Sequence, residues 1–288
     1  MEKKLFPFIK LFFLIFLFYT FLVLISQSFC DETSSRLALV IGNSKYQHIS
    51  SLRNPTNDAE DLAAALKQIG FKVTTLLNAT KREMLSEIRK FGEELRRHDT
   101  GLFYFAGHGL QFEGRNYLVA VDSDIVKDID IPFESLDLGR ILAEMEDAGT
   151  KVNIVILDAC RNNPYSGKFR SVERGLSVVR APKGSLIVYS TAPGDVALDG
   201  EGRNGVFTEA LLKHISKPGI DIEVLLKDVR QDVQIATKGR QVPWTNSSLT
   251  TGFYFVPPQK ENASSTTRPR SKIQELILER ARKDGVVP

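Results

Sequence analysis

The chain has 288 residues, of which 42% are hydrophobic and 25% charged, a composition that fits one large globular domain or two small ones and excludes a disordered protein. The formal net charge is +3, and it falls to +1 (35 basic against 34 acidic residues) when residues 1–28, with three Lys and one Glu, are set aside. A body this close to neutral argues against nucleic acid as a partner.

The first thirty residues differ from the rest of the chain. Lys3, Lys4 and Lys10 precede an uncharged run over 11–30, which ends with small residues at Ser26 and Ser28. This order is typical of a secretory signal at 1–28, with cleavage after Ser28 or, as a second option, after Cys30. A retained anchor is the alternative, because about 20 uncharged residues can cross a bilayer. We therefore expect an exported protein, periplasmic or extracellular, or one anchored in the membrane through residues 11–30 alone.

From residue 36 onward the chain alternates between strand and helix patterns. The predicted strands are 37–42, 71–77, 101–106, 152–157, 185–190 and 252–256, with 116–121 as a strand or hairpin arm; the predicted helices are 57–69, one capped by Thr80, 135–148, 205–215 and 222–237. This alternation predicts an α/β domain over 35–256, with a parallel sheet between helices on both faces. Residues 257–288 form a polar linker and a short amphipathic helix in this interpretation.

Two of the predicted strands lead to residues that carry out nucleophilic chemistry. His108 follows the strand 101–106, and Cys160 follows the strand 152–157. The carboxyl ends of parallel strands meet at one edge of a sheet, so we expect the imidazole and the thiol to lie together. Such a pair is sufficient for cysteine nucleophilic catalysis, with the backbone N–H groups of Gly109 and Cys160 as candidate oxyanion donors. The alternatives are a buried structural cysteine and a histidine that acts only as a surface donor.

Several motifs resemble those of the caspase-like cysteine peptidases, the clan of caspases, metacaspases and paracaspases, including bacterial caspase-domain proteins. The two catalytic signatures are matched by Tyr104-Phe105-Ala106-Gly107-His108-Gly109 and Leu157-Asp158-Ala159-Cys160-Arg161, and further motifs by 39–43, 57–59, 189–192 and 205–208. The resemblance implies a three-layer α/β/α sandwich, the caspase–haemoglobinase fold, with a mostly parallel six-stranded sheet. It also implies a His108/Cys160 dyad that cleaves peptide bonds.

The sequence departs from animal caspases around the cysteine, with Asp158 two residues before it and Asn162 two residues after it. Metacaspases carry aspartate at the first of these positions, and the resemblance implies that Asp158 forms the floor of the primary specificity pocket, with Asp58 and Ser190 as further substrate-binding residues. An acidic pocket attracts a basic side chain, so the expected substrate is a protein or peptide cleaved after Arg or Lys. For Asp58 the alternative is a residue favoured at a helix N-terminus.

The segment 161–183 is rich in Arg and Lys, and it lies where this family separates its large and small subunits. A protease specific for basic residues would cut itself there after Arg170, Arg174 or Arg180; a solvated surface loop is the alternative.

No cofactor and no metal site is expected from the spacing of potential ligands. Metacaspases often need calcium, and four acidic residues lie close together here without the spacing of an EF-hand: Asp122, Asp124, Asp128 and Asp130. A calcium requirement therefore stays open, as do the physiological substrate, the activating signal and the oligomeric state. The competing functional hypotheses are a catalytically silent caspase-fold scaffold or binding module, and a different acyl-transfer hydrolase that uses the same dyad.

Overall fold

A computed structural model describes residues 35–160, 172–173, 176–192, 197, 200 and 202–258. The predicted signal segment and the helix predicted near the C-terminus lie outside these residues. No helix in the described ranges is both long and apolar enough to cross a membrane.

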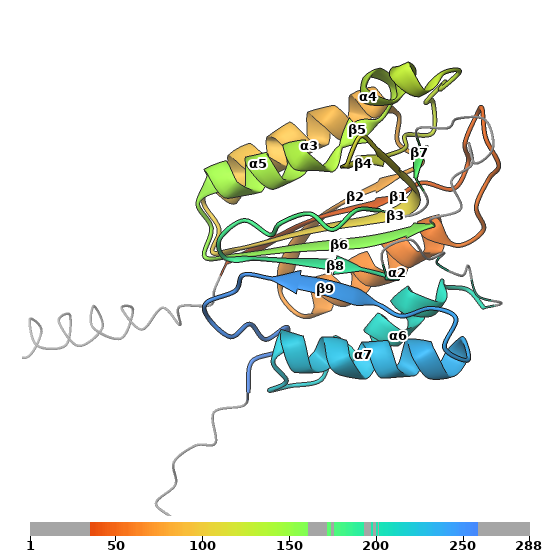
Figure 1. Cartoon of the computed structure of the whole chain (residues 1–288). Helices are drawn as coiled ribbons and strands as arrows, with labels where there is room; N and C mark the ends of the chain where they lie inside the picture. The colour runs from red at the N-terminus through yellow and green to blue at the C-terminus, as the bar shows by residue number, and fades with distance from the viewer. Residues whose placement is uncertain are drawn as a thin grey trace, which may run out of the picture.

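A six-stranded sheet forms the centre of the molecule (Figure 1). Its strands, in spatial order, are β2 (Phe71–Leu77), β1 (Arg36–Gly42), β3 (Thr100–Phe112), β6 (Val152–Cys160), β8 (Ser185–Tyr189) and β9 (Trp244–Ser247). The first five strands are parallel, and β9 pairs antiparallel with β8. The predicted mostly parallel six-stranded sheet is therefore confirmed.

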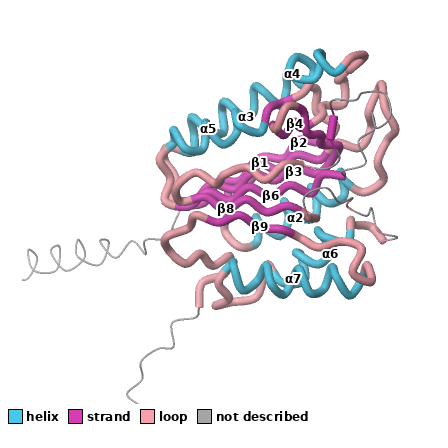
Figure 2. The backbone as a smooth tube through the Cα atoms, in the orientation of Figure 1, coloured by secondary structure: helices cyan, strands magenta, loops and turns pink. Residues whose placement is uncertain are grey.

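Helices cover both faces of this sheet, as Figure 2 shows. One layer holds α3 (Lys81–Leu95) and α5 (Leu138–Ala148); the other holds α2 (Pro55–Gln68), α6 (Val206–His214) and α7 (Ile222–Ala236). Small elements extend the end of β3: β4 (Arg115–Leu118), η1 (Asp128–Asp130), α4 (Ile131–Glu134), β5 (Leu136–Asp137) and β7 (Val172–Glu173). The predicted three-layer α/β/α architecture is confirmed.

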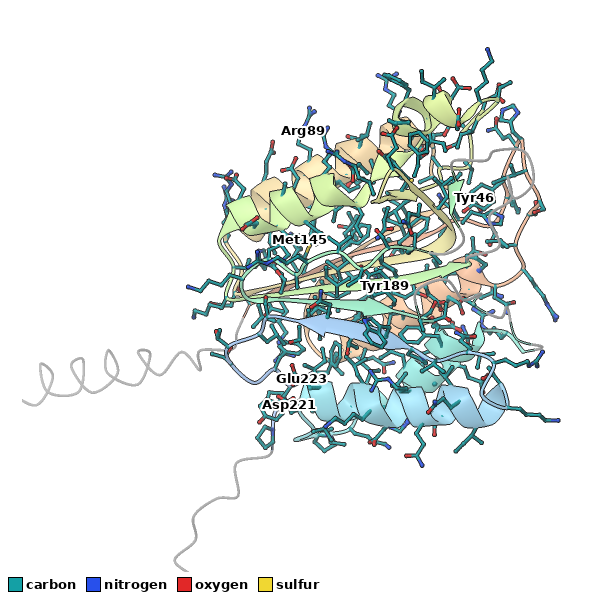
Figure 3. The ribbon with its side chains drawn as sticks, in the orientation of Figure 1. Tyr46, Arg89, Met145, Tyr189, Asp221 and Glu223 are labelled. Carbon is teal, nitrogen blue, oxygen red and sulfur yellow. The ribbon has the colours of Figure 1, made fainter. Side chains whose placement is uncertain are left out.

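The central strand β3 explains why a separate apolar core forms on each face of the sheet. Side chains alternate between the faces of a strand, so Leu102 and Tyr104 pack toward α2, α6 and α7 while Phe103 and Phe105 pack toward α3 and α5. Every residue of β3 is buried, which is the pattern of a parallel strand covered on both sides. Met145, labelled in Figure 3, belongs to the core between α5 and the sheet. Packing on both faces thus holds β3 in place, including its carboxyl end, where His108 lies.

Helix starts follow the local signals of the sequence. The Thr80 hydroxyl accepts a hydrogen bond from the Glu83 amide at 3.3 Å, and the Glu83 carboxylate accepts one from the Thr80 amide at 2.8 Å. This is the capping box that the sequence predicts. Helix α2 begins at Pro55, two residues earlier than predicted, because proline at the first helical position has its φ already set and needs no amide partner.

The predicted strand at 252–256 is wrong. The last strand of the sheet is β9, and the segment 252–256 makes only isolated bridges, from Tyr254 and Val256. Its apolar alternation has another cause, because Phe253 and Phe255 bury their rings in the core beside α7. Two carbonyl oxygens of the segment, those of Tyr254 and Phe255, accept hydrogen bonds from the Arg36 guanidinium at 3.1 and 2.6 Å.

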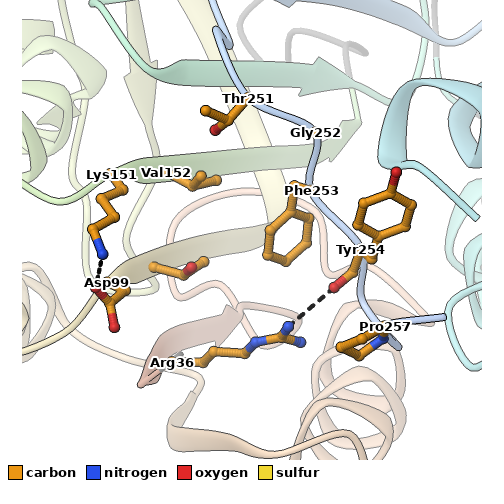
Figure 4. A pocket seen from close by; sticks show the side chains of 10 residues that line it. Arg36, Asp99, Lys151, Val152, Thr251, Gly252, Phe253, Tyr254 and Pro257 are labelled. Carbon is orange, nitrogen blue, oxygen red and sulfur yellow. Dashed lines mark hydrogen bonds and ion pairs between the residues drawn. The ribbon is translucent and has the colours of Figure 1, made fainter. Parts of the chain in front are cut away.

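Arg36 lines a pocket of about 260 Å³ at the amino-terminal edge of the sheet. Figure 4 shows the side chains around it. The Arg36 guanidinium lies 5.5 and 5.3 Å from the centres of the Phe71 and Phe253 rings, and burial lowers its pKa. Arg36 thus fastens the end of the domain to β1, at the edge opposite the predicted dyad.

Candidate active site

His108 and Cys160 are paired in register on the neighbouring parallel strands β3 and β6. Neighbouring strands lie about 4.8 Å apart, so the two backbones are within reach of a side-chain pair. Cys160 is the last residue of β6, whereas β3 continues four residues beyond His108. Of Cys160 only the backbone belongs to the described part of the chain.

The imidazole of His108 is buried and held from two sides. Its Nε2 lies 2.9 Å from the backbone carbonyl oxygen of Ser50, and its ring centre lies 4.7 Å from that of Tyr46. A carbonyl oxygen only accepts hydrogen bonds, so the neutral ring carries its proton on Nε2. Nδ1 then holds the lone pair that could accept a proton from a thiol.

Tyr46 also fixes the backbone at His108. Its hydroxyl oxygen accepts a hydrogen bond of 2.7 Å from the His108 amide. Figure 3 shows Tyr46 at the side of the molecule toward which the parallel strands run. Tyr46 and Ser50 both lie in the segment that connects β1 to α2, and nothing in the periodicity of the sequence singles them out.

Gly107 allows this close approach. Its φ is +154°, and a Cβ added there would lie 2.6 Å from the Tyr46 hydroxyl and 2.9 Å from the Phe105 ring. Glycine is therefore required next to His108 on both conformational and steric grounds.

The amide of Gly109 is directed away from β4. Gly109 pairs with Leu118, and the hydrogen bond of 3.0 Å from the Val119 amide to the His108 carbonyl makes this a non-hydrogen-bonded pair of the antiparallel ladder. The N–H of Gly109 consequently points to the opposite side of β3, the side on which β6 lies.

The two predicted acidic residues converge on one point, although Asp58 comes from α2 and Asp158 from the end of β6. The Asp58 carboxylate accepts a hydrogen bond of 2.9 Å from the Gly205 amide. A Cβ added at Gly205 would lie 3.2 Å from Asp58 Oδ2 and 3.7 Å from Asp158 Oδ2. Two carboxylates therefore approach one point next to the strand that ends in Cys160.

The loop that carries Gly205 is held against the start of α2. Arg203 donates to both carboxylate oxygens of Asp61, at 2.8 and 3.0 Å, and the Asn57 side chain donates to the Arg203 carbonyl at 3.0 Å. The guanidinium lowers the pKa of Asp61. These contacts hold the residues just before α6 in place and thereby position Gly205 between the two acids.

Ser190 lies on the same edge, directly after β8. Leu157 and Tyr189 are paired in register, so the residues that follow them, Asp158 and Ser190, are neighbours. The Ser190 amide donates to the Leu157 carbonyl at 3.0 Å, and the Ser190 carbonyl accepts from the Gln241 side chain at 2.8 Å. The buried hydroxyl oxygens of Ser190 and Thr191 have no hydrogen-bond partner among the described residues. They are polar groups available to a ligand at this edge.

Of the three predicted self-cleavage positions, Arg170 and Arg174 lie outside the described residues. Arg180 is exposed, but the residue before it is fixed: the Val179 amide donates to the Tyr189 hydroxyl at 3.3 Å, and the Val179 carbonyl accepts from Asn246 at 2.8 Å. A protease needs an extended and accessible chain, so these bonds disfavour cleavage after Arg180.

Three of the four acidic residues over 122–130 accept hydrogen bonds from backbone amides. Asp122 accepts from the Lys81 amide at 2.8 Å, Asp128 from the Ile129 amide at 2.9 Å and Asp130 from the Lys127 amide at 2.7 Å. Within the ranges that the structure describes, no three His, Cys, Asp or Glu side chains form a group that could hold a metal ion.

Comparison with known proteins identifies the family of this chain. Residues 35–254 match the family model of the caspase domain. A Mus musculus protein named mucosa-associated lymphoid tissue lymphoma translocation protein 1 homolog is 31% identical over 223 residues, which cover 74% of this chain and 26% of that protein. Caspase-1 of Rattus norvegicus is 27% identical over 244 residues, 78% of this chain and 60% of that protein.

A probable protease of a Desulfuromonadales bacterium is 27% identical over 184 residues, 58% of this chain and 20% of that protein. The match thus spans from one fifth to three fifths of the length of these relatives. The caspase-domain family model matches most of the chain, and the α/β fold is consistent with that match. The chain therefore belongs to the caspase-domain family of cysteine proteases.

Proposed function

We propose that this protein is a cysteine endopeptidase that cleaves proteins after Arg or Lys through His108 and Cys160. The observation that carries the proposal is the register of the two residues on β3 and β6, together with the hydrogen bond that leaves a lone pair on His108 Nδ1. Both features are what a thiol–imidazole dyad needs.

The reaction follows from these positions. His108 Nδ1 takes the proton of the Cys160 thiol, and the thiolate sulfur attacks the carbonyl carbon of the scissile peptide bond. The amides of Gly109 and Cys160 donate to the oxyanion of the tetrahedral intermediate. The imidazolium returns its proton to the leaving amine as the C–N bond breaks, and water then hydrolyses the thioester, which regenerates the thiol.

The preference for a basic residue rests on the two carboxylates that border Gly205. Asp58 and Asp158 approach the same point from different elements. A guanidinium or an ammonium placed there has two partners, whereas an acidic side chain would be repelled by both. Ser190 lies on the same edge, and its hydroxyl, which has no hydrogen-bond partner among the described residues, is a further group for substrate binding.

Matched peptides that differ only in the residue before the scissile bond test the proposal. We expect hydrolysis of the Arg and Lys peptides by the wild type, no hydrolysis of the Asp peptide, and no activity in Cys160→Ala. Preference for the Asp peptide would overturn the specificity. Absence of hydrolysis for every peptide, together with slow alkylation of Cys160 by iodoacetamide that His108→Ala leaves unchanged, would identify a catalytically silent scaffold.

Self-processing is a second consequence of a basic specificity. The proposed positions are Arg170 and Arg174 ahead of Arg180, whose neighbour Val179 is hydrogen-bonded to β8 and β9 side chains. Incubation of the wild type beside Cys160→Ala, each with and without added calcium, measures it. We expect wild-type fragments that end at Arg170 or Arg174; a single intact band in both proteins excludes self-processing.

The location of the protein is proposed from residues 1–30 alone. We expect the mature chain to be exported after cleavage behind Ser28, or to stay anchored through residues 11–30. Fractionation and N-terminal sequencing of the expressed full chain separate these outcomes, and an uncleaved protein in the soluble cytoplasmic fraction contradicts both.

A further inference from the structure

Thr208 makes two short hydrogen bonds in the first turn of α6. Its Oγ1 lies 2.7 Å from Asp158 Oδ2 and 2.7 Å from the hydroxyl oxygen of Tyr104. Both Thr208 and Tyr104 are fully buried, with 0% of their surface exposed. A threonine hydroxyl has a single proton, and an ionised carboxylate only accepts. When Asp158 is ionised, Thr208 donates to Asp158 and accepts from Tyr104.

The three residues come from three different elements of the fold. Tyr104 lies in the middle of β3, Thr208 on α6 and Asp158 at the end of β6. The Tyr104 ring is buried in the apolar core between the sheet and α2, α6 and α7, and this packing holds its hydroxyl next to Thr208. The chain of hydrogen bonds from Tyr104 through Thr208 to Asp158, here called the relay, thus holds the Asp158 carboxylate from the core side.

Helix α6 also holds the second acid. The amide of Gly205, the N-cap residue of α6, donates to Asp58, while the Thr208 hydroxyl three residues later donates to Asp158. One turn of helix therefore fixes both carboxylates. The sequence offered one signal for this, because Thr208 closes one of the motifs that resemble bacterial caspase-domain proteins.

We propose that Thr208 and Tyr104 are positioning residues for substrate specificity, which orient Asp158 and favour its ionised form. The proposal rests on the proposed function, in that Asp158 receives the basic side chain of the substrate. A hydrogen bond to the ionised carboxylate stabilises it, and a chain of hydrogen bonds strengthens each member. Loss of the relay weakens the recognition of a basic residue and leaves the chemistry of Cys160 unchanged.

Thr208→Val tests the relay, because valine keeps the shape of threonine and lacks the hydroxyl. For an Arg peptide and the full chain, we expect KM to rise about tenfold and kcat to stay within about twofold, as one lost charge-assisted hydrogen bond implies. The acid limb of the pH profile of 1/KM moves to higher pH, because the carboxylate protonates more easily. Thr208→Ser restores KM to within about twofold, and Tyr104→Phe, which keeps the ring, raises KM about threefold.

The rate of Cys160 alkylation by iodoacetamide is the control for the dyad, and it stays at the wild-type value in all three variants. An unchanged KM in Thr208→Val overturns the proposal, as does an equal loss in Thr208→Ser, or a fall of kcat and alkylation together. If Thr208→Val does not fold, the KM values of Tyr104→Phe and Thr208→Ser test the proposal in its place.

Benzamidine, a small aromatic amidinium, separates failure of the relay from failure of the proposed function, since calorimetric titration with it needs no catalysis. A wild type that cleaves no peptide but binds benzamidine about tenfold more tightly than Thr208→Val supports the relay and contradicts the peptidase. Equal binding by both proteins overturns the relay alone. A wild type that neither cleaves nor binds overturns both.

Discussion

His108 and Cys160 occupy paired positions on adjacent parallel strands, although they lie 52 positions apart in the chain. The relation follows from topology, because β3 and β6 are neighbours at the centre of the sheet and run in the same direction. β3 continues into the hairpin with β4, whereas β6 ends at Cys160. His108 thus lies within a strand, whereas Cys160 is the last residue of its strand, at the edge of the sheet where parallel α/β proteins bind their ligands.

Replacement of His108 by alanine tests the dyad most simply. His108→Ala removes the base that accepts the thiol proton, so we expect kcat/KM for an Arg peptide to fall by about 10²–10⁴-fold. The matched control is His98→Ala, whose imidazole hydrogen-bonds a backbone carbonyl of α3 instead. A loss of the same size in both variants would show that the effect is on folding and not on catalysis.

Gly107→Ala should disturb both the fold and the dyad. The new methyl group would lie 2.6 Å from the Tyr46 hydroxyl at a φ of +154°, which predicts a loss of about 2–3 kcal/mol of unfolding free energy and most of the activity. Gly114→Ala also has a positive φ, +74°, but no atom within 4 Å of the added Cβ. Urea denaturation should show a loss of only about 1 kcal/mol for this control. Equal losses would contradict the steric role of Tyr46.

Gly205→Ala is expected to narrow the space between the two acids without unfolding the domain. Its φ of −62° and ψ of 151° suit alanine, but the methyl group would lie 3.2 Å from Asp58 Oδ2. We expect KM for an Arg peptide to rise at least fivefold with an unchanged thermal midpoint. Gly202→Ala serves as the control, because the nearest atom to its Cβ is 3.9 Å away. A wild-type KM in Gly205→Ala would place the substrate's basic side chain elsewhere.

The ion pair between Arg203 and Asp61 predicts a pH effect at the entry to α6. Because the guanidinium lowers the pKa of Asp61, its stabilising contribution is present above the ordinary aspartate pKa of about 3.9 and is lost as the pH falls through the lowered value. Asp61→Asn should therefore lower the thermal midpoint at pH 7, and the difference from the wild type should vanish at strongly acidic pH. It should also raise KM for basic peptides, since the loop that carries Gly205 loosens.

Asp99→Asn is the matched control for this prediction. Lys151 lowers the pKa of Asp99 in the same way, but this pair lies at the opposite edge of the sheet (Figure 4). We expect a similar dependence of stability on pH and a wild-type KM. A raised KM in Asp99→Asn would mean that stability alone controls substrate binding.

The sequence predicted those features that depend on strand direction and apolar periodicity. The order of strands and helices placed His108 and Cys160 at one edge, and family motifs pointed to Asp58 and Asp158. It did not reveal Tyr46, since the course of the segment between β1 and α2 depends on tertiary contacts that no local pattern encodes.

The misplaced last strand has a similar cause. Trp244–Ser247 is a polar edge strand with little periodicity, whereas Phe253 and Phe255 alternate because they fill the core beside α7. Alternating apolar residues indicate that one side of an extended segment is buried. Such a segment can bury these side chains without being hydrogen-bonded into the sheet.

The most direct test of the account is covalent labelling of Cys160 by a peptide probe with an electrophilic ketone, followed by intact-mass and fragment mass spectrometry. We predict one adduct on Cys160 with an Arg probe, none on Cys30, and no adduct with the matched Asp probe; both His108→Ala and Asp158→Asn should slow the labelling at least tenfold. Equal labelling by the two probes, or an unlabelled Cys160, would contradict a basic-specific cysteine endopeptidase.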